Sequence, residues 1–169
     1  MRTSNALLLG SIALFVGSLG CTTTSGVSLT RGVSLRPDGT PGPQECSEEA
    51  KKTMSILRAR VGDSTLVDLD ANQIDSEPIT LYDGPIESVA REGFGTLGAL
   101  TRFYGQVWTS GPQVVIRYYE AHPVDGDKVP ICAVARLGDG QMRKLPGSKP
   151  GMAILESSIA AAFVVDAFR

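Results

Sequence analysis

The chain has 169 residues and a formal net charge of −2, and 42% of its residues are hydrophobic while 20% are charged. These values are typical of a globular protein with room for one domain of ordinary size. The nearly balanced charge gives no electrostatic footprint for nucleic acid, which requires a basic face or stripe, so we expect no nucleic-acid partner.

The first twenty residues have the order of an export signal. A short basic start is followed by the apolar run Ala6–Val16, which is shorter than the roughly 20 apolar residues that a membrane-spanning helix needs. The run leads into Ser18-Leu19-Gly20-Cys21, where Ser18 replaces the leucine usual in lipoproteins. This order predicts a lipoprotein signal peptide over residues 1–20 and lipidation of Cys21. An ordinary signal peptide cut nearby, which would leave Cys21 a free thiol, is the alternative.

Lipidation of Cys21 predicts that the mature protein stays on a membrane. Two or three acyl chains attach a protein almost irreversibly, because each buried methylene contributes about 0.8 kcal/mol. The next residue is Thr22 rather than an acidic residue, which favours the outer over the inner membrane of a Gram-negative bacterium. We therefore expect a protein of the cell envelope, held through its N-terminal lipid on the periplasmic face of the outer membrane.

The mature chain divides into a linker and one domain. Residues 21–43 are rich in Ser, Thr, Gly and Pro, a composition that is typical of a flexible tether. The remaining residues, 44–169, are expected to form a single β-rich globular domain.

The three cysteines of the chain divide in the same way. Lipidation of Cys21 leaves Cys46 and Cys132 as an even pair in an oxidising compartment, which predicts a disulfide between them. Closing a loop of about 85 residues contributes on the order of 4 kcal/mol in the chain-entropy model. Two buried free thiols are the alternative. One histidine and two distant cysteines lack zinc-ligand spacing, and we predict no metal and no cofactor.

The first element expected in the domain is a helix over Ser47–Arg60. Ser47 is a suitable N-cap, acidic residues follow in the first turn, and arginines come in the last. Cys46, Ala50, Met54 and Leu57 share one face, so this face is expected to pack on the sheet with the cysteine in it.

After Gly62 the sequence changes to short runs of β-branched and aromatic residues separated by turn residues, which predicts antiparallel strands. Asp125-Gly126 predicts a hairpin, Ser110–Pro112 a second tight connection, and Leu137–Gly151 a long loop. The fold class is therefore α+β, with one N-terminal helix packed on a mainly antiparallel β-sheet or small β-barrel. The strands are expected near Ser64–Asp70, Ile79–Tyr82, Ile86–Arg91, Thr101–Thr109, Gln113–Glu120, Lys128–Ala135 and Ala161–Phe168.

Two motifs resemble ligand sites only in part. Gly93–Gly98 matches G-x-G-x-x-G, but the segment that follows is too short for the helix of a dinucleotide site, and we interpret it as a flexible loop. Asp68–Asn72 begins like a calcium loop, but Gln73 and Ile79 stand where that loop needs glycine and a bidentate glutamate. We interpret this segment as a solvated strand end.

Some residues are of the types that hydrolases use for catalysis, and they are the basis of the alternative, enzymatic interpretation. His122, the single histidine, precedes Pro123 at a hairpin mouth, and no G-x-S-x-G motif accompanies it, so we interpret it as a surface turn residue. Glu87, Glu92 and Glu120 are carboxylates that a fold can bring together, although their spacing alone does not indicate a pair for glycoside cleavage.

Aromatic residues on adjacent strands suggest a binding face. Alternate positions of neighbouring strands lie on the same side of a sheet, and core packing is the usual role of such residues. If the face is exposed, two arginines add polar anchors to it. The candidate binding face consists of Arg102, Tyr104, Trp108, Arg117 and Tyr119.

Several phrases along the domain carry a resemblance: Val61-Gly62-Asp63, Tyr82–Ile86, Tyr104–Thr109, Pro130-Ile131-Cys132 and Pro146–Gly151. Together they resemble uncharacterised bacterial lipoproteins that are often encoded beside serine/threonine protein kinases. The resemblance covers most of the mature chain, including both domain cysteines, and brings no catalytic residue with it. It implies an envelope address and, through gene neighbourhood, signalling. The strands around Phe103–Gly105 and Ile116–Tyr118 are also similar to the barrel domain of type IV secretion scaffold proteins.

These patterns predict a lipid-anchored envelope protein whose domain is a non-catalytic binding or interaction module, with an envelope protein as a further partner. A small periplasmic hydrolase acting on cell-wall material is the first alternative. A structural component of an envelope assembly is the second.

Overall fold

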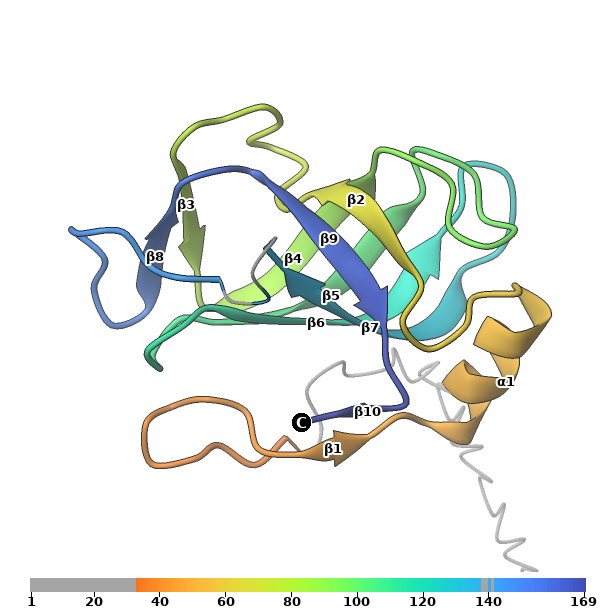
Figure 1. The fold of residues 1–169 in the computed structure, drawn as a ribbon, viewed down its shortest axis with the longest axis horizontal. Coiled ribbons are helices and arrows are strands. Elements are labelled where there is room, and N and C mark those ends of the chain that lie inside the picture. The colour runs from red at the N-terminus through yellow and green to blue at the C-terminus, as the bar shows by residue number, and fades with distance from the viewer. Residues whose placement is uncertain (1–32, 138–139, 141) are drawn as a thin grey trace, which may run out of the picture.

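The computed structural model describes residues 33–137, 140 and 142–169. The signal peptide predicted over residues 1–20, the lipidation site Cys21 and the tether up to residue 32 lie outside the described residues. One helix packs on a closed antiparallel barrel, and two small sheets lie beside it (Figure 1). The predicted α+β class with a small barrel is confirmed. None of the helices within the described part has the length and apolar character to cross a membrane.

The barrel closes through six strands in the order β2-β4-β5-β6-β7-β9. The neighbours pair antiparallel throughout, including the predicted consecutive set β5, β6 and β7. Closure comes from β2 with β9, where Ser64 pairs with Phe163. The strands are β2 (Ser64–Asp68), β4 (Gly84–Ala90), β5 (Arg102–Trp108), β6 (Val115–His122), β7 (Val129–Arg136) and β9 (Ile159–Val164).

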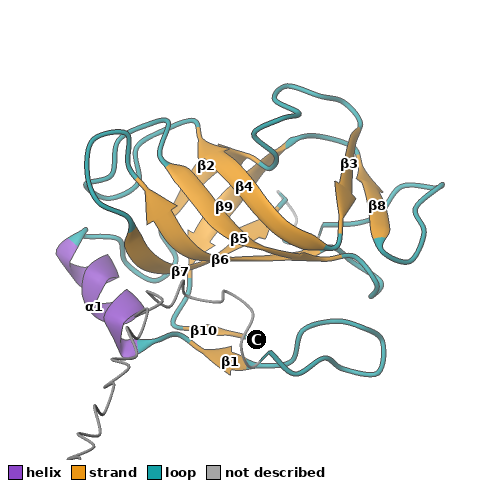
Figure 2. Ribbon diagram, turned by 180° about the vertical axis from the view of Figure 1, so that it is seen from behind, coloured by secondary structure: helices purple, strands orange, loops and turns teal. Residues whose placement is uncertain are grey.

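Two further sheets have two strands each. β3 (Ile79–Tyr82) pairs with β8 (Met152–Leu155), and β1 (Gln44–Glu45) pairs with β10 (Ala167–Phe168). The view from behind shows β3–β8 at one end of the barrel and the helix at the other (Figure 2). The C-terminal run is extended, as predicted, but it is divided between β9 and β10. Its last two residues therefore leave the barrel to pair with the start of the domain.

Helix α1 spans Glu48–Ile56 and is shorter than predicted. Ser47 is its N-cap, as expected, and the hydroxyl accepts a hydrogen bond of 3.1 Å from the Ala50 amide. The helix stops early because Arg58 adopts the left-handed conformation, with φ of 59°, and Ala59 donates from its amide to the Met54 carbonyl. This is a Schellman ending. The arginines expected in the last turn therefore lie beyond the helix.

The predicted buried face of α1 is confirmed. Cys46, Ala50 and Met54 are buried, and Leu57 is half-buried against the same cluster. The Cys46–Cys132 disulfide is present, with the two Cα atoms 5.9 Å apart and a sequence separation of 86. It ties the chain just before α1 to the outer side of β7.

Side chains fill the barrel interior. Phe103 packs edge-on against Phe94 at 5.5 Å between ring centroids and tilts against Tyr118 at 5.6 Å. The buried Tyr118 hydroxyl lies 2.7 Å from Ser88 Oγ, which donates to the Leu69 carbonyl at 2.6 Å. Because these buried polar groups are hydrogen-bonded, they do not destabilise the core.

The segment predicted as a flexible loop, Gly93–Gly98, is a tight turn docked on α1. Phe94 and Leu97 are buried and exchange backbone hydrogen bonds, and Thr96 donates from its amide to the Leu57 carbonyl at 2.8 Å. A Cβ on Gly95 would lie 2.2 Å from the Leu57 oxygen, and Gly95 has φ of 61°. The glycine there permits the close approach of the turn to the helix end.

Asp68 differs from the solvated strand end that was expected. It is 4% exposed and forms two hydrogen bonds with Arg91, from Nε at 2.9 Å and from Nη2 at 2.8 Å. Asp75 also contacts the same guanidinium, and these two carboxylates raise the pKa of Arg91. Burial of the carboxylate is tolerated because the pair is bidentate.

Residues 33–43, which the composition assigns to the tether, contact the domain. Gly42 and Leu35 sit on opposite arms of a small loop that runs beside the barrel (Figure 1). A Cβ on Gly111 would lie 2.1 Å from Thr40 Cγ2. The loop thus packs closely on the connection between β5 and β6.

Candidate functional site

The predicted binding face lies on the outer side of β5 and β6, and the structure divides it into two parts. Arg102 and Tyr104 lie at one end, and Trp108, Arg117 and Tyr119 lie at the other. The first part is open to solvent at Arg102, whereas Arg117 is 1% exposed and Trp108 is 8% exposed. The five residues therefore do not form one exposed surface.

The covered part is a small second core around Arg117. Its guanidinium lies 5.5 Å from the Trp108 ring centroid and 4.9 Å from that of Phe168, which are cation–π distances. Nη2 donates to the carbonyl oxygens of Pro41 at 3.3 Å and Gly42 at 2.9 Å. Burial lowers the pKa of Arg117. This part of the predicted face holds the N-terminal loop on the barrel.

The other part is a row of charged and aromatic side chains. Glu87 forms an ion pair with Arg102, and the Tyr104 ring stacks on His122 at 4.2 Å between centroids. Burial and the neighbouring Glu87 carboxylate raise the pKa of Tyr104. His122 is the last residue of β6, half-buried rather than a free turn residue, and its Nε2 contacts Glu120.

Two of the three candidate hydrolytic carboxylates share this row. Glu87 and Glu120 both lie opposite Tyr104, one on β4 and the other on β6. Each is engaged by a basic group, Glu87 by Arg102 and Glu120 by His122 and Lys128. Glu92 is exposed beyond the end of β4. The row lies on the outer side of a filled barrel.

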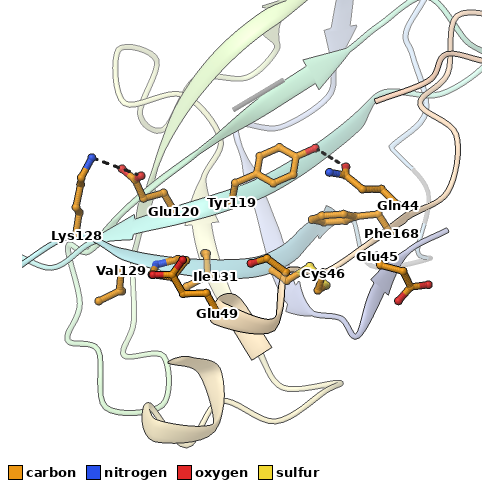
Figure 3. Close-up of a pocket in the computed structure, with 13 residues that line it drawn as sticks. Gln44, Glu45, Cys46, Glu49, Tyr119, Glu120, Lys128, Val129, Ile131 and Phe168 are labelled. Atoms are coloured by element: carbon orange, nitrogen blue, oxygen red, sulfur yellow. Dashed lines mark hydrogen bonds and ion pairs between the residues drawn. A yellow bond between two sulfur atoms is a disulfide. The ribbon is translucent and has the colours of Figure 1, made fainter. Parts of the chain in front are cut away.

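A pocket of about 440 Å³ opens beside this row, between the chain entering α1 and the strands β6 and β7 (Figure 3). Its apolar lining comes from Tyr119, Val129, Ile131 and Phe168, and the Cys46–Cys132 disulfide lies at its inner side. Such a volume and apolar lining are typical of small-ligand sites. The polar residues of the pocket are Gln44, Glu45, Ser47, Glu49, Glu120 and Lys128.

A β-bulge brings two consecutive residues of β6 into the pocket. Neighbouring residues of a strand normally face opposite sides, yet Tyr119 and Glu120 both line the pocket. The pairing register shifts between Tyr118 and Glu120 on the β7 side, and such a shift turns side chains locally. An aromatic surface and a carboxylate therefore meet at one place.

The short sheet β1–β10 forms the wall of the pocket opposite β6 and β7. Gln44 pairs with Phe168, whose ring packs edge-on against Tyr119 at 5.2 Å between centroids. The Tyr119 hydroxyl donates to Gln44 Oε1 at 3.3 Å. Burial raises the pKa of Tyr119, and its protonated phenol is the donor in this bond.

The charges around the pocket are unequal. Glu120 lies 3.8 Å from Lys128 and also contacts His122. Glu45 and Glu49 are exposed, and neither has an ion-pair partner among the residues that the structure describes. Within the same described ranges, no group of three His, Cys, Asp or Glu side chains is placed to hold a metal ion.

The sequence pointed to part of this pocket. Tyr119, Glu120 and the cysteine pair are among the residues that the sequence marks as candidates, whereas Glu45, Glu49, Lys128 and Phe168 are not. No local signal marks Glu45 and Phe168, because β1 and β10 have two residues each and meet from opposite ends of the domain. Glu49 on α1 and Lys128 before β7 join the pocket only through the packing of the helix on the barrel.

Neither a protein-family model nor a curated protein matches this sequence. The geometry of the pocket therefore carries the functional argument.

Proposed function

We propose that this chain is a lipid-anchored envelope protein whose domain is a non-catalytic binding module, and that the pocket beside the disulfide is its binding site. The observation that carries the proposal is the pocket itself, which combines an apolar lining with charged groups at its opening. The export signal and Cys21 support the envelope address, and so does the resemblance to lipoproteins encoded near protein kinases.

The side chains in the pocket favour binding over hydrolysis. Two hydroxyls line it: Ser47 Oγ accepts a hydrogen bond from the Ala50 amide as an N-cap, and the Tyr119 hydroxyl donates to Gln44. Glu120 is shared between His122 and Lys128, and nucleophilic catalysis needs a base directed at a nucleophile instead. The groups present are suited to hold a ligand by apolar contact and charge.

Site-specific photo-crosslinking in living cells tests the proposal. A photoreactive amino acid replaces Lys128, whose side chain is 62% exposed at the pocket, or Glu156 as a control, which is exposed and does not line it. We expect adducts from position 128 and none from position 156. The proposal fails if neither position gives an adduct, or if both give the same ones.

The anchor has its own test. We expect Cys21→Ala to lose the acyl mass and to leave the membrane fraction. If the variant remains with membranes and keeps the same mass difference from the unmodified chain as the wild type does, the proposed anchor is wrong.

A further inference from the structure

We infer that the pocket takes a short, extended peptide segment that presents a lysine or arginine beside a large apolar side chain. This inference rests on the proposed binding function and adds the chemistry of the ligand. It is drawn from three properties of the pocket: its lining, its charge and its shape.

The lining demands an apolar group. Val129 and Ile131 on β7 face Phe168 and Tyr119, which come from β10 and β6. Ile131 and Phe168 are already buried, whereas Tyr119 and Val129 are half-buried and gain free energy when a ligand covers them, at roughly 25 cal/mol per Å² of apolar surface. A ligand that carried only a charge would leave this apolar surface exposed to water.

The charge selects a cation to accompany the apolar group. Lys128 and Glu120 largely neutralise each other at one end, and Glu48 on the helix is paired with Lys51. Glu45 and Glu49 form no ion pair within the described residues, although Lys51 lies near Glu45, and Arg36 and Arg169 line a neighbouring hollow with it. Among the residues that line the pocket, Glu45, Glu49 and Glu120 outnumber the single Lys128, and the N-terminus of α1 offsets only about half a charge, so the lining carries a net negative charge.

The shape favours a chain over a compact molecule. The labelled residues extend from Lys128 and Glu120 at one end to Gln44 and Phe168 at the other (Figure 3). Two stretches of backbone, 44–47 and 128–132, run along the pocket. About 440 Å³ holds a few side chains and is too small for a folded element.

Selection from a displayed library of random peptides, about seven residues long, tests this inference on the full-length protein in detergent. We expect the selected peptides to carry Lys or Arg next to Leu, Ile or Phe. The double variant Glu45→Gln, Glu49→Gln should weaken a selected peptide about tenfold, because two exposed charge contacts are lost. The matched control Glu92→Gln, Glu156→Gln changes the net charge equally but lies outside the pocket, and should leave the affinity unchanged.

The outcomes separate this inference from the proposed function. Selected peptides that are neutral or acidic, and that block crosslinking from position 128, would show a binding pocket with a different ligand chemistry and would overturn the inference alone. Equal weakening by the control pair would reduce the effect to overall charge and also overturn it. No selected peptide together with no crosslink from position 128 would overturn both.

Discussion

Arg117 donates a hydrogen bond of 2.9 Å to the carbonyl oxygen of Gly42, which lies 75 residues earlier in the chain. This contact joins the outer side of the barrel to the segment that leads from the predicted anchor. The folded domain therefore begins before β1, because residues 33–43 of the predicted tether pack on it.

The substitution Arg117→Ala should release this loop. It removes two hydrogen bonds from a charged donor and the contacts with two aromatic rings, so we expect the free energy of unfolding to fall by about 2–3 kcal/mol. Limited chymotrypsin digestion should then cut after Leu35, in the same loop, sooner than in the wild type. Arg60→Ala, at an exposed side chain, is the control and should change stability by less than about 0.5 kcal/mol. Unchanged cutting after Leu35 would show that Arg117 does not hold the loop.

Tyr118 makes the fold sensitive to alkali. Complete burial raises the pKa of its hydroxyl above the ordinary value of 10.0. In the unfolded chain this hydroxyl ionises near its ordinary pKa, whereas in the fold it stays protonated. The unfolded state is therefore favoured progressively as the pH rises above about 10, and the free energy of unfolding falls.

The substitution Tyr118→Phe isolates this effect. At neutral pH it should cost about 1 kcal/mol, because one hydrogen bond is lost while Ser88 keeps its bond to the Leu69 carbonyl. Between about pH 9 and pH 11 the variant should lose less stability than the wild type. Denaturant unfolding at a series of pH values measures both. If the free energy of unfolding falls in parallel with pH in the two proteins, groups other than Tyr118 cause the loss of stability in alkali.

The disulfide should contribute strongly to stability. Cys46 and Cys132 are separated by 86 residues, and a loop of that length corresponds to about 4 kcal/mol in the chain-entropy model. We expect the double variant Cys46→Ser, Cys132→Ser to lose about this amount and to become insensitive to reductant. Cys21→Ser keeps the disulfide and serves as the control. If reductant lowers the wild-type unfolding midpoint no further than that of the double variant, the bond does not form in the protein.

The features that could be predicted depend on local sequence signals, and those that could not depend on long-range pairing. Ser47 marked the start of α1 because capping depends on a few adjacent residues, and alternation of apolar residues located most barrel strands. Closure of the barrel could not be predicted from the sequence. It depends on the pairing of Ser64 with Phe163, and these two residues come from opposite ends of the domain. The pocket was missed for the same reason, since its walls come from β1, β6, β7 and β10.

The burial of the predicted binding face was the second property that the sequence did not determine. Trp108, Arg117 and Tyr119 do lie on one face with alternate spacing, as predicted from their strands. Whether that face was free depended on the loop 33–43 and on Phe168, which cover it. Composition gave no reason to expect a Pro/Gly-rich segment to pack so closely.

The end of α1 offers a test of the backbone conformation. Arg58 adopts φ of 59° in the Schellman ending, and its side chain is exposed. Glycine reaches this conformation without the steric cost that a Cβ brings, which is roughly 1 kcal/mol or more. We therefore expect Arg58→Gly to raise the free energy of unfolding by about 1 kcal/mol, as measured by thermal or denaturant unfolding. Lys52→Gly, in the exposed interior of the same helix, should lower it by a similar amount. Destabilisation by both variants would mean that Arg58 does not occupy the left-handed position.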